Sequence, residues 1–215
     1  MRNFVWALAL LFASAGFAQA DLVITGVIDG DLFGGNPKAV VVTATANIAD
    51  LSLFGIGSAN NGGGSDGEEF SLSGSASSGD ILIISANADS FDFFNDCFIH
   101  TVFQDGAANI NGDDAIELFQ NGAVIDTYGD INVLGDGETW DYSDGYAVRT
   151  GGVAGAFDQA NYSSNAFALD GLDAAAQKDI LATAFNFQSA AIPEPATATL
   201  IGFAALGLCG LRRRS

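Results

Sequence analysis

Short apolar segments, separated by residues that favour turns, make up the central part of this chain. Each segment has four to seven residues and is followed by Gly, Asn, Asp or Ser. Runs of this length with frequent turn residues are typical of an antiparallel β-sandwich or barrel. The sequence therefore predicts an all-β fold with one weak helix at 172–184, a Gly-rich loop at 60–67, and strands at 22–28, 39–45, 51–56, 69–72, 81–85, 98–103, 115–119, 124–128 and 146–149.

The strongest local pattern is a β-hairpin around Asn121-Gly122. This pair suits a two-residue type I′ turn, in which both positions require a positive φ. Such a turn fixes the register of the two strands and predicts that Ile116, Leu118 and Ile125 point into the core. The predicted pairs are Gln120–Ala123, Leu118–Ile125 and Ile116–Thr127.

The same register places Glu117 opposite Asp126 on the other face of the hairpin. Two carboxylates directly across a strand pair repel each other, so something must offset them. Solvent, a bound cation or a basic side chain could do so. Our hypothesis is Arg149, because it ends a later predicted strand and a guanidinium can bind a carboxylate through two hydrogen bonds.

Residues 1–20 have the three parts of a secretory signal peptide. Arg2 gives the positive start and an apolar run follows from Phe4 to Phe12. The stretch ends in Ala18-Gln19-Ala20, an A-x-A cleavage site, so the mature chain is expected to begin at Asp21. A buried helix at the start of the fold is the alternative.

The other end, residues 191–215, combines Pro193-Glu194-Pro195, an uncharged apolar stretch at 196–211, and Arg212-Arg213-Arg214. As a helix the apolar stretch would reach only about 24 Å, less than a hydrocarbon core of about 30 Å. A short span with a basic stop suits an anchor that is held briefly, with the arginines on the cytoplasmic side.

These terminal features together resemble a PEP-CTERM sorting tail. The resemblance implies recognition by an exosortase-type membrane enzyme and cleavage near Pro193 to Pro195. The product would then be released to the envelope, cell surface or extracellular matrix of a Gram-negative bacterium. A plain C-terminal membrane anchor is the alternative, and in both cases the body faces outward.

Without its two ends the body is strongly acidic. Three basic residues, Lys38, Arg149 and Lys178, stand against 25 acidic ones, a net charge of about −22. Nucleic-acid binding depends on cationic contacts to phosphate, so this composition argues against it. Cys97 is the body's lone cysteine and Cys209 lies in the tail, so we expect a buried thiol and no internal disulfide in the processed chain.

A second resemblance covers residues 22–151, most of the body. The segment from Asn111-Gly112-Asp113-Asp114-Ala115 through Gly129 resembles the core of lamin-tail-like domains. Matching pieces in chain order are 22–30, 36–40, 49–52, 78–80, Trp140 and 148–149. The resemblance implies an immunoglobulin-like β-sandwich for residues 21–190 and a role in binding or anchoring more than in catalysis.

Few residues in the chain are typical of catalysis. His100 is the lone histidine, so a zinc site built on several histidines cannot form. No G-x-S-x-G motif is present. Paired acids of the kind that cleave glycosides occur at Glu68-Glu69, at Asp113-Asp114, and at Asp141 with Asp144, but surface charge on loops is the favoured interpretation of all three.

Calcium is the metal that the sequence suits best, although no cofactor is required by it. Oxygen ligands on Gly-containing loops favour this ion. One candidate set is Asn109, Asn111, Asp113 and Asp114, and the other is Asp136, Glu138, Asp141 and Asp144. Turn formation is the favoured alternative, because Asn and Asp side chains bond their own backbone.

Two aromatic stretches are candidates for stacking on sugars. Each alternates aromatic residues with acids, amides or glycine, and their members are Phe91, Phe93 and Phe94, and Trp140, Tyr142 and Tyr146. A core cluster that caps the sandwich is the favoured alternative.

The combined prediction is an exported, non-catalytic protein of the cell surface or extracellular matrix. It would act in adhesion or in organising the exopolysaccharide of a biofilm matrix, through carbohydrate or protein contacts. An extracellular glycan hydrolase using paired carboxylates, or an accessory domain of an extracellular nuclease system, are the alternatives.

Overall fold

The computed structural model describes residues 20–189. The signal-peptide and sorting-tail predictions, which rest on Ala18, Pro193, Glu194, Pro195 and Arg212 to Arg214, lie outside this range. Within it, no helix is both long enough and apolar enough to cross a membrane.

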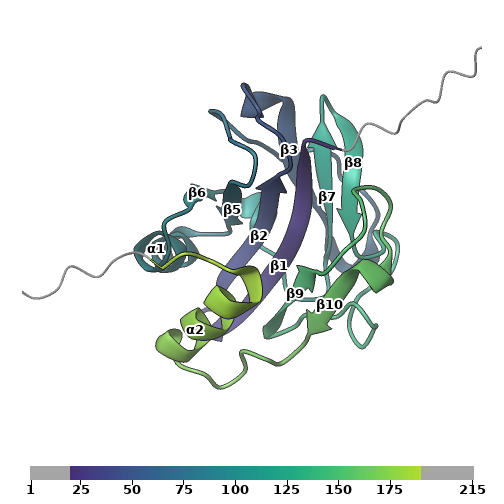
Figure 1. Ribbon diagram of the computed structural model, residues 1–215. Helices are drawn as coiled ribbons and strands as arrows, with labels where there is room; N and C mark the ends of the chain where they lie inside the picture. The colour runs from purple at the N-terminus through teal and green to yellow at the C-terminus, as the bar shows by residue number, and fades with distance from the viewer. Residues whose placement is uncertain (1–19, 190–215) are drawn as a thin grey trace, which may run out of the picture.

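Ten strands in residues 20–189 form two sheets (Figure 1). The larger sheet has the order β10-β9-β1-β2-β5-β6 and the smaller one β4-β3-β7-β8. This arrangement agrees with the predicted all-β sandwich. The strands are β1 (Leu22–Leu32), β2 (Asn36–Ala44), β3 (Phe54–Ala59), β4 (Phe70–Ser71), β5 (Ile81–Ser85), β6 (Thr101–Gln104), β7 (Ala115–Gln120), β8 (Ala123–Tyr128), β9 (Gly145–Arg149) and β10 (Tyr162–Asn165).

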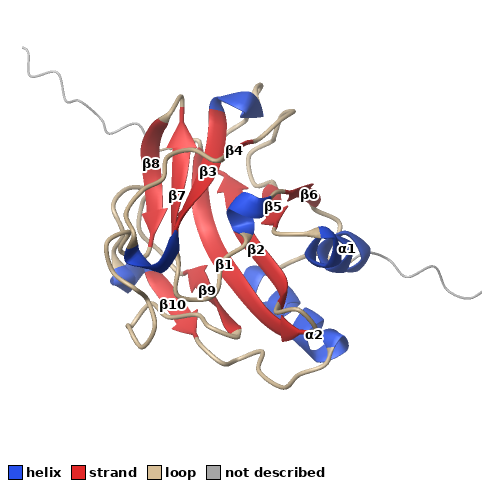
Figure 2. Ribbon diagram, turned by 180° about the vertical axis from the view of Figure 1, so that it is seen from behind, coloured by secondary structure: helices blue, strands red, loops and turns tan. Residues whose placement is uncertain are grey.

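Two helices, α1 (Ala88–Cys97) and α2 (Ala174–Phe185), pack on the face of the larger sheet that points away from the smaller one. The reverse view shows β3, β7 and β8 on the other side (Figure 2). The molecule is therefore three layers deep over part of the larger sheet. Four single-turn 3-10 helices lie in the connections: η1 (Leu51–Leu53), η2 (Asn60–Gly62), η3 (Gly106–Ala108) and η4 (Gln159–Asn161).

Each layer boundary has its own apolar core. Val40 and Val42 of β2 belong to the core between the sheets, whereas Val41 belongs to the core beneath the helices. Side chains alternate along a strand, so a strand covered on both faces needs apolar residues at every position. This requirement explains the unbroken apolar run in the middle of β2.

All nine predicted strands are present, with ends that differ by a few residues. The tenth, β10, has the sequence Tyr162-Ser-Ser-Asn165 and pairs with β9 at an edge of the larger sheet. A largely polar edge strand carries little apolar pattern, which is why the sequence did not predict it. β5 and β6 are parallel, and α1 forms the connection between them, as parallel neighbours require a crossover.

Helix α2 agrees with the predicted helix at 172–184, whereas α1 is not among the predicted elements. The Asn87 side chain accepts the Ser90 N–H and caps the start of α1. Phe94 is fully buried in the core beneath the helices. Phe93 and Cys97 of α1 are half-buried and pack against the same core. These few apolar residues lie among acids and other polar residues, so the sequence pattern did not indicate a helix.

The predicted β7–β8 register is correct only next to the turn. Asn121 and Gly122 both have positive φ, and Gln120 pairs with Ala123. A shift then follows, so that Leu118 pairs with Asp126, and Glu117 with Thr127. An extra residue in one strand sends every later side chain to the opposite face. The predicted Leu118–Ile125, Ile116–Thr127 and Glu117–Asp126 pairs are therefore wrong.

Candidate functional site

Asp126 and Arg149 join the two sheets. Asp126 is 1% exposed, and its Oδ2 lies 2.6 Å from a terminal guanidinium nitrogen of Arg149. The same carboxylate accepts the N–H groups of Ile24 (2.8 Å) and Gly155 (3.0 Å). The guanidinium also lies 4.7 Å from the ring centre of Tyr162. Arg149 was expected to offset both acids of the hairpin, but Glu117 takes no part in this ion pair.

A second buried ion pair fixes the loop before β7. Lys38 Nζ bonds Asp29 and also donates to the Ile110 carbonyl (2.6 Å) and the Asn111 side-chain oxygen (3.2 Å). Burial raises the pKa of Asp29, and the bond to Lys38 opposes that rise. Asn111, a predicted calcium ligand, is therefore a partner of a lysine.

Two of the predicted calcium residues use both carboxylate oxygens to hold loops. Asp114 is fully buried and accepts the N–H groups of Asn61 (2.8 Å) and Asn111 (3.0 Å). Asp141 accepts those of Gly137 (3.0 Å) and Ser143 (2.9 Å). The bonds from Asn111, Gly137 and Ser143 are local turn bonds of the kind that was the favoured alternative, whereas the bond from Asn61 joins the loop to a distant segment.

The other predicted calcium ligands do not all lie together, because Asp144 lies in a cluster separate from Asp113, Asp136 and Glu138. Burial and the neighbouring Asp114, Asp136 and Asp141 raise the pKa of Asp113, whose Oδ1 is buried without a hydrogen-bond partner. Glu138 is exposed. Calcium binding at Asn111, Asp113, Asp114, Asp136 and Glu138 stays a prediction.

Asp144 lies elsewhere, with two acids that the sequence did not connect to it. One carboxylate oxygen from each of Asp31, Asp144 and Asp170 lies within 4.8 Å of the others. Burial raises the pKa of Asp144, and the charges of Asp31 and Asp170 raise it further. Residues so far apart in the sequence meet only through the fold, so spacing along the chain could not reveal this cluster.

The other predicted acid pair also serves its own loop. Glu69 Oε2 accepts the N–H (2.8 Å) and the hydroxyl (3.0 Å) of Ser58, while Glu68 accepts the hydroxyl of Ser71 (2.6 Å). The Glu69 bonds tie the segment before β4 to β3, whereas the Glu68 bond goes to β4 itself, so the two adjacent carboxylates have different partners.

Most of the predicted sugar-stacking aromatics belong to the core. Trp140 is 4% exposed and Tyr142 is fully buried, and both pack edge-on against Tyr128. Burial raises the pKa of Tyr142 far above its ordinary value. Stacking on a sugar is therefore wrong for Trp140 and Tyr142, and Phe94 is buried in the same way.

Phe93 is different, because it lines a hollow of about 400 Å³ with Phe33 and the acids of α1. Phe33 lies between β1 and β2 and is 98% exposed. No pattern in the sequence separates an exposed phenylalanine from the many buried ones, so it was missed.

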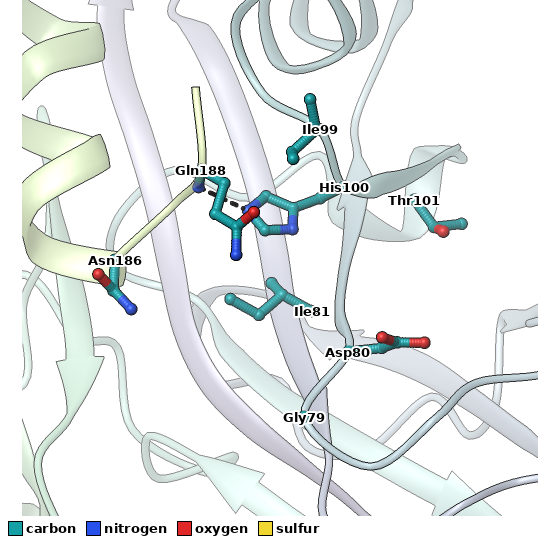
Figure 3. Close-up of a pocket in the computed structure, with 8 residues that line it drawn as sticks. All are labelled: Gly79, Asp80, Ile81, Ile99, His100, Thr101, Asn186 and Gln188. Carbon is teal, nitrogen blue, oxygen red and sulfur yellow. Dashed lines mark hydrogen bonds between the residues drawn. The ribbon is translucent and has the colours of Figure 1, made fainter. Parts of the chain in front are cut away.

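A polar pocket of about 330 Å³ opens beside β5 and β6 (Figure 3). Three chain segments supply its walls: residues 79–81 before and in β5, residues 99–101 at the start of β6, and residues 186–188 after α2. Its polar side chains are Asp80, His100, Thr101, Asn186 and Gln188. They comprise a carboxylate, an imidazole, a hydroxyl and two carboxamides, so the pocket offers both hydrogen-bond donors and acceptors.

His100 is held in place as a neutral imidazole. Its Nε2 accepts the backbone N–H of Gln188 at 3.1 Å, and its ring packs 5.3 Å from that of Phe187. Burial lowers the pKa of His100 below its ordinary value. Since an accepting Nε2 leaves the proton on Nδ1, the imidazole can donate one hydrogen bond to a ligand. The close-up shows the ring beside Gln188, with Ile99 above it and Ile81 below it in this view (Figure 3).

Comparison of the chain with protein-family models, curated proteins and solved structures found no match.

Proposed function

We propose that this chain is an exported, non-catalytic protein of the cell surface or extracellular matrix, and that it binds polysaccharide through the pocket around His100. The signal-peptide pattern of residues 1–20 and the resemblance of residues 191–215 to a PEP-CTERM tail support export. The lamin-tail-like motifs between residues 22 and 151 support a binding or anchoring role, because that class is associated with such roles more than with catalysis.

The polar pocket is the observation that carries the proposal. Sugar hydroxyls both donate and accept hydrogen bonds, and they are bound by sets of polar groups placed by a rigid scaffold. Asp80, the imidazole of His100, Thr101 and two carboxamides form such a set at the edge of the larger sheet. With one carboxylate and no basic side chain among its lining residues, the pocket suits neutral sugars better than acidic ones.

The way the acids are used supports a non-catalytic role. Glycoside cleavage uses two carboxyl groups that flank the scissile bond. Glu68 and Glu69 bond different serines, Asp114 and Asp141 each hold two backbone N–H groups, and Asp144 lies with other acids. Acids that are committed to loops in this way are poorly placed to act as an acid and a base on one substrate.

A glycan array, followed by titration of the purified protein with the best ligand, tests this proposal. We expect binding to neutral oligosaccharides. Replacing two side chains of the pocket, Thr101→Val with Gln188→Ala, should weaken that binding at least tenfold. Thr139→Ala, which changes an exposed residue outside the pocket, should leave it unchanged.

A third variant, Phe33→Ser, separates the pocket from the hollow beside α1. If Phe33→Ser abolishes binding while the pocket variant binds normally, the site lies at Phe33 and the assignment to the pocket is wrong. Release of sugar from an oligosaccharide by the wild-type protein would favour the glycan hydrolase instead.

A further inference from the structure

Glu117 has a buried side chain. Because of the β8 bulge it pairs with Thr127 and not with Asp126, the neighbour that a regular register predicts. It lies in the middle of β7 between Gly57 of β3 and Thr127 of β8, on the face of the smaller sheet that points away from the core. A residue on an outer face is normally exposed, yet Glu117 is 4% exposed. Something other than the second sheet must therefore cover it.

The Gly-rich loop before β4 provides part of this cover. A Cβ added at Gly57 would lie 2.0 Å from the Gly67 carbonyl oxygen, so the loop runs directly over β3 at the position next to Glu117. The Gly64 N–H bonds the Ile131 carbonyl (2.8 Å), which fastens the same loop to the segment after β8. Glu117 thus lies beneath two loops that are bound to each other.

A pocket of about 290 Å³ remains beside this carboxylate. Glu117 and Thr127 line it from the sheet, Asp130 and Ile131 from the loop after β8, and Phe157 from the segment before β10. Among the described residues, neither ion pair includes Glu117, and no hydrogen bond to its carboxylate is formed. The Glu117 side chain is 4% exposed, lines the pocket and has no partner among residues 20–189, so a cationic donor in the pocket could form a charge-assisted hydrogen bond with its carboxylate.

The lining indicates which cation fits. Calcium requires six to eight oxygen ligands, and this pocket presents two carboxylates, one hydroxyl and an apolar wall. An ammonium group needs only about three acceptors. The side chains of Ile131 and Phe157 suit an aliphatic stem behind that group, and an aromatic ring also attracts a cation. No basic side chain lines the pocket, so an anionic ligand would meet only repulsion.

We propose that this pocket binds a primary ammonium group on an aliphatic stem, with Glu117 as its ion-pair partner. The same chemistry occurs in a free diamine and in the side chain of a lysine. This site is separate from the polysaccharide pocket, because Glu117 lies in β7 of the smaller sheet, whereas the pocket around His100 lies beside β5 and β6 of the larger sheet.

Calorimetric titration of the purified full chain with pentane-1,5-diamine tests the proposal. We expect saturable binding that pentan-1-ol, the matched neutral probe, does not reproduce. Glu117→Gln keeps the shape of the side chain and removes its charge, and it should weaken diamine binding at least tenfold. Glu138→Gln, at an exposed acid, is the matched control and should bind as the wild type does.

Amide NMR shifts of the wild-type protein locate the site without any variant. The diamine should shift the signals of Thr127 and Gly129, which line the pocket, and leave those of residues 99–101 unchanged. N-acetyl-lysine methylamide distinguishes a lysine side chain from a free diamine as the ligand. If it produces the same shifts, a lysine side chain is an acceptable ligand, and if it does not, the ligand is a free amine.

Three results would overturn the proposal. The first is the absence of binding up to about 10 mM diamine, because a dissociation constant above that concentration would be weaker than specific binding. The second is unchanged affinity in a folded Glu117→Gln variant. The third is binding of glucosamine that equals or exceeds binding of the diamine, because a sugar ring would then replace the aliphatic stem.

Discussion

Replacing Asp126 by alanine should destabilise this protein more than the loss of Glu117, the other acid in β7 and β8. The carboxylate lies 2.6 Å from the Arg149 guanidinium and accepts two backbone N–H groups. Removing it leaves the cation and both N–H groups without this acceptor. The contact also links β8 of one sheet to β1 and β9 of the other, so the loss affects the joint between the sheets.

The magnitude follows from the burial of the pair. Removing one partner of a buried ion pair costs roughly 3–5 kcal/mol, and a buried N–H that loses its acceptor costs about 1–3 kcal/mol. Arg149 keeps its bonds to the carbonyls of Ile24 and Val153, which moderates the loss. We therefore expect about 4 kcal/mol, a large part of a typical unfolding free energy of about 5–15 kcal/mol. In a domain of this size, each kcal/mol lowers the melting temperature by roughly 2–4 °C, so the midpoint should fall by about 8–16 °C.

Urea unfolding followed by circular dichroism measures this effect. Asp179→Ala, at an exposed acid of α2, is the control and should change stability by less than about 0.5 kcal/mol. The double variant Asp126→Leu with Arg149→Met should lose less than the sum of the two single changes, because it leaves no unpaired charge. A loss below about 1 kcal/mol for Asp126→Ala would show that the ion pair does not hold the sheets together.

Three further predictions concern other parts of the fold. Asp144→Asn should raise stability at neutral pH by roughly 0.5 kcal/mol, because it removes one of three close carboxylates and asparagine tolerates the positive φ of 45°. The pKa of Asp144 is raised in the folded state, so protonation of Asp144 stabilises the wild type as pH falls towards 4. The difference in unfolding free energy between Asp144→Asn and the wild type, measured by urea unfolding, should therefore disappear at that pH. A difference that stays constant with pH would contradict this prediction. Gly57→Ala should displace the loop at Gly67 and lower the melting temperature, whereas Gly67→Ala, with free space around its Cβ but a φ of 89°, should pay only the cost of that backbone strain. Oligosaccharide binding should stay constant from pH 8 down to about 6.5 and fall only below it, because the pKa of His100 is lowered and the neutral ring is the binding form; a loss of binding already near pH 7 would contradict this.

Local patterns were enough to predict the elements whose causes are local. The type I′ turn at Asn121-Gly122 depends on two positive φ angles, and both residues have them. The strands followed from apolar periodicity, including β5, whose bounds agree with the prediction. Helix α2 likewise follows an Asp173 cap and a run of good helix formers.

The features that sequence reasoning missed depend on contacts between distant segments. The β8 bulge brings Asp126 to Ile24 and Arg149, which are 102 and 23 residues away in the chain. No residue near the turn indicates that Asp126 makes these contacts, so the sequence favours a regular register. Glu117 in its pocket is a second case, because its cover comes from loops at 60–67 and 129–131.

The candidate site shows the same division. The sequence indicated that His100 is the lone histidine, which excludes a zinc site built on several histidines, and that many of the acids lie on loops. It did not indicate that Asn186 and Gln188 lie beside His100, because the segment after α2 reaches β6 only in the folded chain. Conversely, Trp140 and Tyr142 alternate with polar residues as in an exposed sugar platform, yet both are buried.

Mass spectrometry of the protein from fractionated cells tests whether it is exported to the surface or matrix. We expect a chain in the surface or extracellular fraction that begins at Asp21 and ends near Pro193 to Pro195. An uncut chain from Met1 to Ser215, found dissolved in the cytosol, would contradict it.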